Sequence, residues 1–170
     1  AQDPNGGWPQ DYPPNGSYRA YFTFNDGAIN NCIRVLLLAR ERKGREDCLK
    51  AALRGGDFIL LSQMPEPAPG WAQQYDRDLK PAPARAFEHA GISALSTSQN
   101  IATLSDLYLA TGDPKYLKPI PAAKAWLERS KIREDTWSRL YDPETFKPFY
   151  AADKTFQKRF DLERLAEDAR

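Results

Sequence analysis

The sequence predicts an all-α fold of helical hairpins joined by long loops. Tryptophan is followed four residues later by tyrosine in WPQDYP, WAQQYD and WSRLYD, which begin at residues 8, 71 and 137. A spacing of about 65 residues is typical of a repeated supersecondary unit. Residues 33–64 also align with residues 101–132 at an offset of 68, which pairs apolar positions and places Gly44 on Gly112. Each unit is therefore expected to contain two helices followed by a loop.

Apolar periodicity predicts the first two helices. Between residues 26 and 43, apolar side chains recur at three- and four-residue steps, and Gly44 follows where a C-capping glycine belongs. A second run covers residues 45–63 and contains Gly55 and Gly56. Each of these glycines costs about 1 kcal/mol relative to alanine in a helix. They indicate either close packing of another helix or a kink.

The second unit is expected to contain a third and a fourth helix. Ser96 or Thr97 is the expected N-cap of the third, which runs to residue 111. Asp113 and Pro114 then start the fourth, because aspartate accepts free N–H groups and proline suits the first helical position. Two further prolines lie early in this helix and are expected to bend it rather than abolish it.

Two long segments lack the helical pattern. Five prolines exclude regular helix over most of residues 64–90, which we expect to form a stiff, ordered loop. Residues 134–156 alternate apolar and polar side chains around a turn, which predicts a short β-hairpin near the C-terminus. Long loops are uncommon in compact helical domains unless they build a site. The expected organisation is one helical domain over residues 1–160 and a charged tail over residues 161–170.

Composition narrows the possible functions. With 24 basic and 23 acidic residues the net charge is +1, which gives no indication of nucleic-acid binding. No apolar run reaches the ~18 residues that a membrane helix requires. The apolar residues that flank Cys32 and Cys48 favour buried free thiols over a disulfide. Together with His89, the two cysteines do not make a zinc site. The sequence carries no phosphate-binding loop or zinc-protease motif. Any catalytic chemistry must therefore come from carboxylates, arginines, lysines and amides.

Five segments between residues 4 and 150 carry a family resemblance. They read PNGGWPQDYP, YFTFNDGAINNCIRVLL, GWAQQYDRDLKPAPARAFE, AKAWLERSKI and WSRLYDPETFKPFY. In this order and with these separations they resemble polysaccharide lyase family 10, the pectic acid lyases. The resemblance implies an α/α toroid, here a partial barrel, and cleavage of polygalacturonate by calcium-assisted β-elimination. Because the chain opens at Ala1 and holds two complete hairpins where the family implies about three, we expect a fragment that lacks N-terminal helices.

The resemblance implies that Ca²⁺ assists the reaction. Removing the proton beside a uronate carboxylate develops enolate-like charge, which a bound cation stabilises as a Lewis acid. Calcium takes oxygen ligands from aspartate, asparagine and backbone carbonyls. Asp26 and Asp76 match the family's acidic positions for calcium and substrate. Some members carry asparagine where this chain has Gly27, which implies either weaker calcium affinity or an amide oxygen supplied by Asn25.

Both aspartates also have a purely structural interpretation. Asp26, or Asn25 before it, is placed to cap the helix that follows, a contribution of about 1 kcal/mol. Asp76 is placed to form an Asx turn within its loop.

Basic and aromatic side chains supply candidate contacts to an acidic polymer. Arg139, in WSRLYD, resembles the arginine of the family's WARFY segment and is the candidate base or clamp for the substrate carboxylate. Arg85 is the second cation, because a bidentate arginine–carboxylate pair would hold a uronate in register. Lys80 and Lys147, each before a proline, are further candidate contacts or solvated ends. Trp71 either stacks on a sugar ring or packs its loop on the hairpin.

The expected function is that of a pectate lyase, which is monomeric and acts outside the cell or in the periplasm, where its polymer lies. The three tryptophan–tyrosine segments are then expected to form three rims of one groove. Two departures count against activity: residues 151–154 read AADK where many members carry an arginine, and residues 97–98 read TS in place of Glu-Ser. The alternatives are a catalytically inactive module that binds acidic polysaccharide or acts as a scaffold, and a lyase for another uronate polymer.

Overall fold

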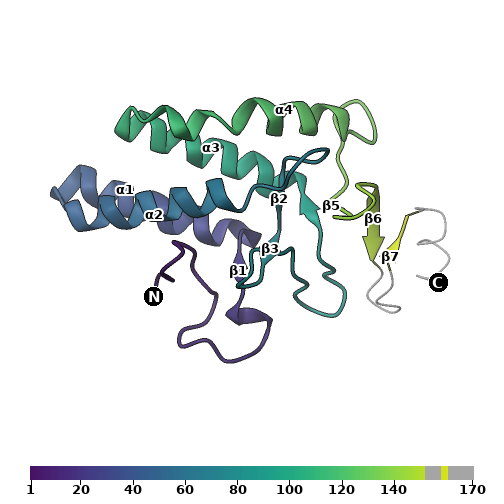
Figure 1. Ribbon diagram of the computed structural model, residues 1–170, viewed down its shortest axis with the longest axis horizontal. Helices are drawn as coiled ribbons and strands as arrows, with labels where there is room; N and C mark the ends of the chain where they lie inside the picture. Colours follow the sequence, from purple (N-terminus) through teal and green to yellow (C-terminus); the bar gives the residue numbers. More distant parts are fainter. Residues whose placement is uncertain (152–157, 161–170) are drawn as a thin grey trace.

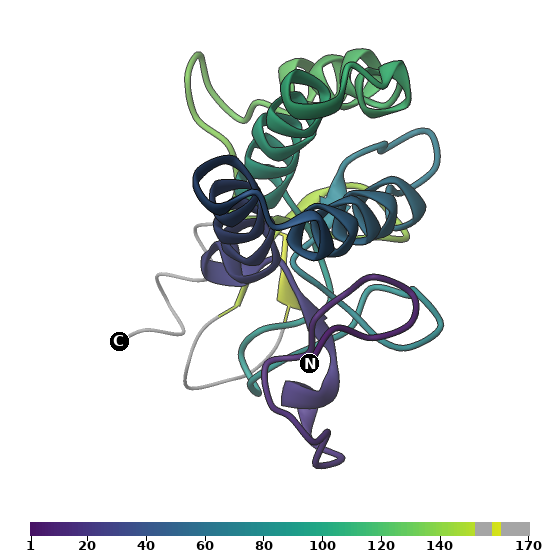
Figure 2. The same ribbon diagram turned by 90° about the vertical axis from the view of Figure 1, so that its left-hand side faces the viewer.

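The computed structural model describes residues 1–151 and 158–160. Its α-helices form two hairpins, α1 (Ala28–Lys43) with α2 (Glu46–Leu61) and α3 (Ala94–Thr111) with α4 (Ile120–Arg129). Figure 1 shows the two hairpins stacked on one another, with the strands gathered toward one end of the helices. The view along the helices in Figure 2 places α3 and α4 above α1 and α2. The loops that leave this end of the hairpins build the candidate site.

The first hairpin forms as the apolar spacing predicts. α1 ends at Gly44, whose left-handed backbone, with φ of 64°, closes the helix. α2 runs unbroken through Gly55 and Gly56, so the alternative of a kink is wrong. A Cβ atom on Gly55 would lie 2.7 Å from Trp8, and one on Gly56 would lie 2.6 Å from Leu107. The two glycines therefore permit close approach of neighbouring side chains.

The second hairpin begins earlier than expected. The N-cap of α3 is Ser93, whose hydroxyl accepts the N–H of Ser96, so the prediction of Ser96 or Thr97 as the cap is wrong. The reason is a short strand that ends at Ser93 and runs directly into the helix. Thr97 instead accepts the N–H of Trp71 at 3.0 Å, which ties the long loop after α2 to α3.

Prolines divide the predicted fourth helix. Asp113 caps its start as predicted, accepting the N–H of Lys115 at 3.0 Å. The first turn is the 3-10 helix η3 (Pro114–Leu117), and α4 begins separately with Pro119 at its N-cap position. The prolines thus break the segment into two helices instead of bending one.

Short antiparallel strands occupy the segments around the hairpins. Two further 3-10 helices, η1 (Tyr18–Ala20) and η2 (Asn25–Gly27), flank strand β1 (Phe22–Thr23), which pairs with β3 (Gln74–Tyr75). A second sheet has the order β2-β4-β5-β6-β7, with strands Trp71–Ala72, Ile92–Ser93, Leu140–Tyr141, Pro148–Ala151 and Lys158–Arg159. The hairpin predicted near the C-terminus is present as β5 and β6. The fold is a mixture of helices and sheets, so the prediction of an all-α toroid is wrong.

Most of these strands leave no pattern in the sequence because they are two residues long. Recognisable alternation requires about four residues or more. Most pairs also join distant segments, as where Ile92 lies opposite Tyr141. The prolines of residues 64–90 correctly exclude helix, but they are compatible with edge and terminal positions of strands. Strand pairing here depends on where the hairpins place the loops, which local sequence does not encode.

Aromatic side chains fill the junction between helices and strands. Phe22, Phe24, Phe58, Trp71 and Tyr75 are all buried. The rings of Phe22 and Phe58 meet edge to face with centroids 5.1 Å apart, and those of Phe24 and Tyr75 meet in the same way at 6.0 Å. Rigid packing beneath the loops fixes the backbone from which the candidate site residues project.

Three smaller predictions concern the cysteines, membrane helices and the tail. Cys32 and Cys48 are free thiols and are only partly buried, and burial raises the pKa of Cys32. Among the described residues, no helix combines the length and apolar character needed to cross a membrane. The charged tail predicted for residues 161–170, and most of the AADK departure, lie outside the described residues.

Candidate functional site

Arg85, Glu88 and Arg139 meet where the loops of the two hairpins converge. The Glu88 carboxylate accepts two hydrogen bonds from the Arg85 side chain, at 2.7 Å from Nε and 2.8 Å from Nη2, and a longer one of 3.4 Å from the Arg85 backbone N–H. It also accepts one, at 3.0 Å, from Nη2 of Arg139. The Glu88 side chain is 3% exposed, whereas those of Arg85 and Arg139 are 53% and 60% exposed. One buried carboxylate therefore holds two arginines that face solvent.

The cluster carries an excess of positive charge. Hydrogen bonds from Arg85 lower the pKa of Glu88, against the opposing effect of burial, and the charge of Arg139 adds to the lowering. The same contact with Glu88 raises the pKa of Arg85. Glu88 is thus an anion at neutral pH and leaves one of the two guanidinium charges uncompensated. Planar guanidinium groups suit carboxylate ligands, so the cluster is built to receive an anionic group.

Local backbone geometry places each member of the cluster. The N–H of Glu88 bonds to the carbonyl oxygen of Arg85 at 2.7 Å, and the N–H of Ala84 bonds to the carbonyl oxygen of Glu88 at 2.9 Å. This tight turn lets Arg85 reach back to Glu88, with its guanidinium over the ring of Phe87 at 4.9 Å. Arg139 directly precedes β5, which is paired on both sides by β4 and β6. The sheet and the turn together fix the two arginines.

Two hollows in the surface share Glu88. The first, about 300 Å³ in volume, is lined mainly by polar groups that include Tyr18, Asn25, Asp26, Gln73, Arg85 and Glu88. The second, about 420 Å³, is lined by Phe87, Glu88, Arg139, Leu140, Phe149 and Tyr150, with Ala151 at one side. The structure therefore brings Asn25, Asp26 and Arg85 together in the first hollow and places Arg139 in the second.

Asp26 is not used as a helix cap. The N-cap position of α1 is Gly27, which makes no side-chain capping bond, so the capping interpretation of Asp26 and Asn25 is wrong. Asp26 has left-handed backbone angles, with φ of 54° and ψ of 20°, and its carboxylate accepts a hydrogen bond of 2.9 Å from Asn25. Its charge also contributes to raising the pKa of Arg85. Asp26 is thus an exposed carboxylate next to the arginine cluster.

Asp76 forms the Asx turn that its sequence context allows. Its Oδ1 atom accepts the N–H groups of Asp78 and Lys80, each at 2.9 Å. The turn closes with Leu79 at φ of 60°. Asp76 is only partly buried, but it does not line the hollow that contains Asp26.

Lys80 and Lys147 occupy equivalent, exposed places in two similar loops. The carbonyl oxygen of Lys80 accepts the N–H of Asp76 at 3.0 Å, and that of Lys147 accepts the N–H of Asp142 at 2.9 Å. Asp142 also caps its own loop, accepting the N–H of Thr145 at 2.8 Å. Neither lysine lines the two hollows.

Trp71 lies in the core, and its ring is inaccessible to a ligand.

Asp26 and its amide neighbours supply oxygen atoms that the first hollow could offer to a metal. In the described part of the chain, no three His, Cys, Asp or Glu side chains gather closely enough to hold a metal ion. Asp26 with the amide oxygens of Asn25 and Gln73 makes a partial set of hard ligands around the first hollow. Such a set suits Ca²⁺, which completes its coordination with water and with oxygens of a bound ligand.

Glu88 and Gln73 are site residues that the sequence interpretation missed. Gln73 lies with its Oε1 atom 3.5 Å from Nη2 of Arg139. The available signal for Glu88 was its position three residues after Arg85, which suits a local ion pair. The signal for Gln73 was its place in the repeat, since it stands third in WAQQYD as Arg139 stands third in WSRLYD.

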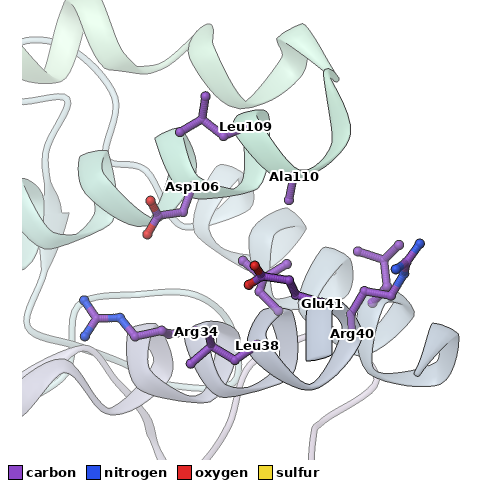
Figure 3. Close-up of a pocket in the computed structure, with 9 residues that line it drawn as sticks. Arg34, Leu38, Arg40, Glu41, Asp106, Leu109 and Ala110 are labelled. Atoms are coloured by element: carbon purple, nitrogen blue, oxygen red, sulfur yellow. The ribbon is translucent and has the colours of Figure 1, made fainter. Parts of the chain in front are cut away.

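A larger hollow, of about 580 Å³, lies among the helices and not at the loops (Figure 3). Arg34 and Leu38 of α1 lie opposite Asp106 and Leu109 of α3 across it. No site residue predicted from the sequence lines this hollow. The convergence of predicted residues therefore favours the two smaller hollows around Glu88.

Comparison with known proteins places these observations in a family. A family model described as pectic acid lyase matches residues 1–147. A solved family 10 polysaccharide lyase from Cellvibrio cellulosa is similar with a TM-score of 0.79 and 24% identity, over 96% of this chain and 60% of that one. An aspartate-to-alanine mutant of family 10 polysaccharide lyase from the same organism, in complex with trigalacturonic acid, is similar with a TM-score of 0.78 and 24% identity, over 96% and 61%.

The present chain thus spans about three fifths of each solved chain. No curated protein sequence matches it. The family model nevertheless covers most of the 170 residues, including four of the five segments that carry the sequence resemblance and most of the fifth, and the solved lyases share the fold. The chain belongs to the pectic acid lyase family, polysaccharide lyase family 10.

Proposed function

We propose that this chain carries the substrate-binding and catalytic residues of a pectate lyase, which cleaves polygalacturonate by calcium-assisted β-elimination. The observation that carries the proposal is the Arg85–Glu88–Arg139 cluster next to the Asp26 carboxylate. Cations for uronate carboxylates and oxygen ligands for calcium stand side by side there. Membership of the pectic acid lyase family, and the trigalacturonic acid bound by the Cellvibrio cellulosa mutant lyase, support an acidic sugar polymer as the substrate.

The two arginines bind and orient the polymer. Arg85 presents its guanidinium to the polar hollow, where the amide groups of Gln73 and Asn25 are available to sugar hydroxyls. Arg139 contacts the reacting sugar from the second hollow. Lys80 and Lys147, which are exposed on the flanking loops, add cationic contacts further along the chain. Trp71 acts on the substrate only indirectly, by holding its loop against α2.

The reaction removes the proton from the carbon beside the uronate carboxylate and expels the glycosidic oxygen from the adjacent carbon. A double bond then forms between these two carbons. Arg139 is the proposed catalytic residue. Its guanidinium, which Glu88 holds at 3.0 Å, would stabilise the negative charge that develops on the uronate carboxylate. Action as the base would instead require a neutral guanidine, which is rarely accessible in proteins.

Asp26 and Asp76 are the proposed acidic ligands of Ca²⁺, with Asn25 supplying an amide oxygen. Bound calcium would neutralise the uronate carboxylate and lower the energy of the enolate-like charge. Asp76 can take part while its Oδ1 atom remains in the Asx turn. We further propose that the protein acts as a monomer outside the cell or in the periplasm, where pectic polymers are met.

Ultraviolet absorbance of unsaturated uronate products tests the function. Purified protein is incubated with polygalacturonate at neutral to alkaline pH, with added Ca²⁺ or with a chelator. We expect absorbance to rise with Ca²⁺ and to stop with chelator and in Asp26→Ala. A protein that quenches its tryptophan fluorescence with the polymer but forms no product would be a binding module and not a lyase. A rise that persists in chelator and in Asp26→Ala would exclude the calcium assignment.

A further inference from the structure

We propose that Glu88 is the positioning residue that divides the two cations between the neighbouring hollows, so that the site takes two consecutive acidic sugars. Arg85 lines the polar hollow, Arg139 lines the second hollow, and Glu88 lines both. The inference rests on the proposed function, because it assigns the cluster to binding of a uronate chain. It adds a role for Glu88 and a requirement that the ligand carry two adjacent carboxylates.

The hydrogen bonds assign Glu88 to both arginines. Its Oε2 atom accepts Nε of Arg85 at 2.7 Å, and its Oε1 atom accepts Nη2 of Arg85 at 2.8 Å. Oε1 also accepts Nη2 of Arg139 at 3.0 Å. The two guanidinium groups are therefore anchored on one carboxylate and approach it from different loops. Neither oxygen of Glu88 is free to serve as a ligand of its own for substrate.

Burial makes Glu88 suited to positioning and unsuited to direct contact with a polymer. Its side chain is 3% exposed, whereas both arginine side chains are more than half exposed. Long exposed arginines normally sample many rotamers, and fixing them costs free energy when a ligand binds. A buried anion that already holds both arginines removes much of this cost before the ligand arrives. Preorganised cations are what a repeating acidic polymer requires.

Both arginines keep N–H donors that Glu88 does not occupy. Among the described contacts, Arg85 uses Nε and Nη2 for Glu88, and Arg139 uses Nη2 for Glu88 and Gln73. An arginine has five N–H groups, so each guanidinium keeps donors for a carboxylate of the substrate. Arg19 also lines the polar hollow, but it pairs with Asp11 at 3.7 Å. Each hollow therefore has one arginine held by Glu88, which matches a polymer whose neighbouring sugars each carry one negative charge.

Glu88→Gln is the direct test, because it preserves shape but presents an amide N–H₂ to an arginine. Glu66→Gln is the control, since Glu66 also pairs with an arginine, Arg129, at 3.1 Å but lies outside both hollows. Calorimetric titration with trigalacturonic acid is expected to show affinity about tenfold weaker in Glu88→Gln, the scale of one charged hydrogen bond, and unchanged in Glu66→Gln. Glu88→Asp, which keeps the charge but is too short to reach both arginines, is expected to lose affinity to a similar extent.

A double-mutant cycle separates positioning from a general structural role. In a chain that already carries Arg85→Ala and Arg139→Ala, Glu88→Gln is expected to weaken binding no further, because Glu88 acts only through those arginines. In the parent chain, exchange of the Arg85 Nε–H proton with water is expected to be slow by NMR, and fast in Glu88→Gln. Partial methyl esterification of the ligand, which removes neighbouring carboxylates, is expected to weaken binding to the parent more than to Glu88→Gln.

Wild-type affinity in a folded Glu88→Gln, or losses that simply add in the cycle, would overturn the inference. Binding of trigalacturonic acid that depends on Glu88, without any unsaturated product, would support the inference while refuting the proposed lyase activity. If Glu88→Gln proves too unstable to titrate, Glu88→Asp and the Arg85 proton exchange of the parent decide. Fast exchange in the parent would show that Glu88 does not hold the arginine.

Discussion

Trp71 donates its indole N–H to the carbonyl oxygen of Ile59 at 2.7 Å, and both residues are fully buried. The contact fastens the loop after α2 to the last turn of that helix. The second hairpin repeats it, because the indole N–H of Trp137 donates to the carbonyl oxygen of Leu127 at 2.7 Å. Leu127 lies 68 residues after Ile59, which is the offset that aligns the two hairpins in sequence. The repeat therefore marks two loops that are anchored in the same way.

The tyrosines extend this equivalence to the site. The hydroxyl of Tyr75 accepts the N–H of Ala72 at 2.6 Å, and that of Tyr141 accepts the N–H of Ser138 at 3.0 Å. The first copy of the motif does not follow, since Tyr12 is 70% exposed. Within the two equivalent copies, the third positions are Gln73 and Arg139, whose side chains meet beside Glu88. Repetition supplies two matching loops, and substitution at one position gives them different chemistry.

Trp71→Phe is expected to lower the free energy of unfolding by about 2–4 kcal/mol. The substitution removes the shorter of two hydrogen bonds to the buried carbonyl oxygen of Ile59, which keeps only the Ser62 hydroxyl at 3.3 Å, and it also opens a small cavity. Trp137→Phe removes the same bond from a half-buried position, so its effect is expected to be smaller. Urea unfolding of both variants measures the difference. Equal losses would show that burial does not set the strength of this anchor.

Acid is expected to weaken the fold through Asp142. Burial alone would raise the pKa of Asp142, but a hydrogen bond from Lys158 and two from backbone N–H groups outweigh it and lower the pKa to about 2, from 3.8. A lowered folded-state pKa gives stability that is fully present above the unfolded pKa and disappears as pH falls from about 4 to about 2. The contribution is about 2 kcal/mol. Urea unfolding across this range should show a shallower pH dependence in Asp142→Asn, and an identical dependence would contradict the assignment.

The helices were predictable from the sequence because their information is local. Gly44 closes α1 and Asp113 caps η3, as their residue types require. The strands were not predictable, because pairs such as Ile92 with Tyr141 form only after the hairpins are placed. The start of α3 was missed for the same reason, since a strand supplies its cap at Ser93.

The same distinction between local and long-range information applies to the candidate site. Arg85, Asp26 and Arg139 could be selected because charged residues in proline-rich or aromatic loops stand out and because the family resemblance names their positions. That Asp26 does not cap α1 depends on the left-handed backbone at Asp26 and Gly27, which no periodicity reveals. Glu88 was missed because its importance comes from an arginine 51 residues away in sequence.

Arg139→Ala is expected to reduce the rate of product formation by about a hundredfold or more, which is the scale of losing one group that stabilises developing charge. Arg85→Ala is expected to act mainly on KM, because it removes binding that does not change during the reaction. Arg139→Lys distinguishes clamp from base. A lysine loses its proton more readily than arginine, so a base role predicts an altered pH dependence of kcat, whereas a clamp predicts an unaltered one. Steady-state kinetics of the three variants measure these effects. Unchanged kinetics in Arg139→Ala would show that Arg139 takes no part in the reaction.

Asp76→Asn separates the structural and metal-binding roles of Asp76. The amide oxygen can still accept the N–H groups of Asp78 and Lys80, so the loop and the unfolding free energy are expected to change little. The lost negative charge is expected to raise the Ca²⁺ concentration needed for half-maximal activity about tenfold, because calcium affinity follows the charge of its ligands. Activity measured against buffered Ca²⁺ gives the answer. If that Ca²⁺ concentration is unchanged, the role of Asp76 is limited to the Asx turn.

Gly27 provides the converse test, in which a ligand is added. The family resemblance implies asparagine at this position in some members, and Gly27 has a left-handed backbone, with φ of 67°. Asparagine tolerates that conformation better than most residues. The atoms nearest to a Cβ at Gly27 would belong to Asn31, at 3.4 Å, an ordinary van der Waals contact.

Gly27→Asn is therefore expected to fold and to lower the Ca²⁺ concentration needed for half-maximal activity, because a second amide oxygen would stand beside Asp26 and Asn25. Gly27→Ala is the control, since it carries the same backbone strain without the oxygen. Calcium titrations of the two variants isolate the contribution of that oxygen. If both variants need the same Ca²⁺ concentration, then Asn25 already fills the role of the absent asparagine or the cation does not lie at this end of α1. Asn25→Ala in the parent chain decides between these outcomes, because only the first makes calcium binding depend on Asn25.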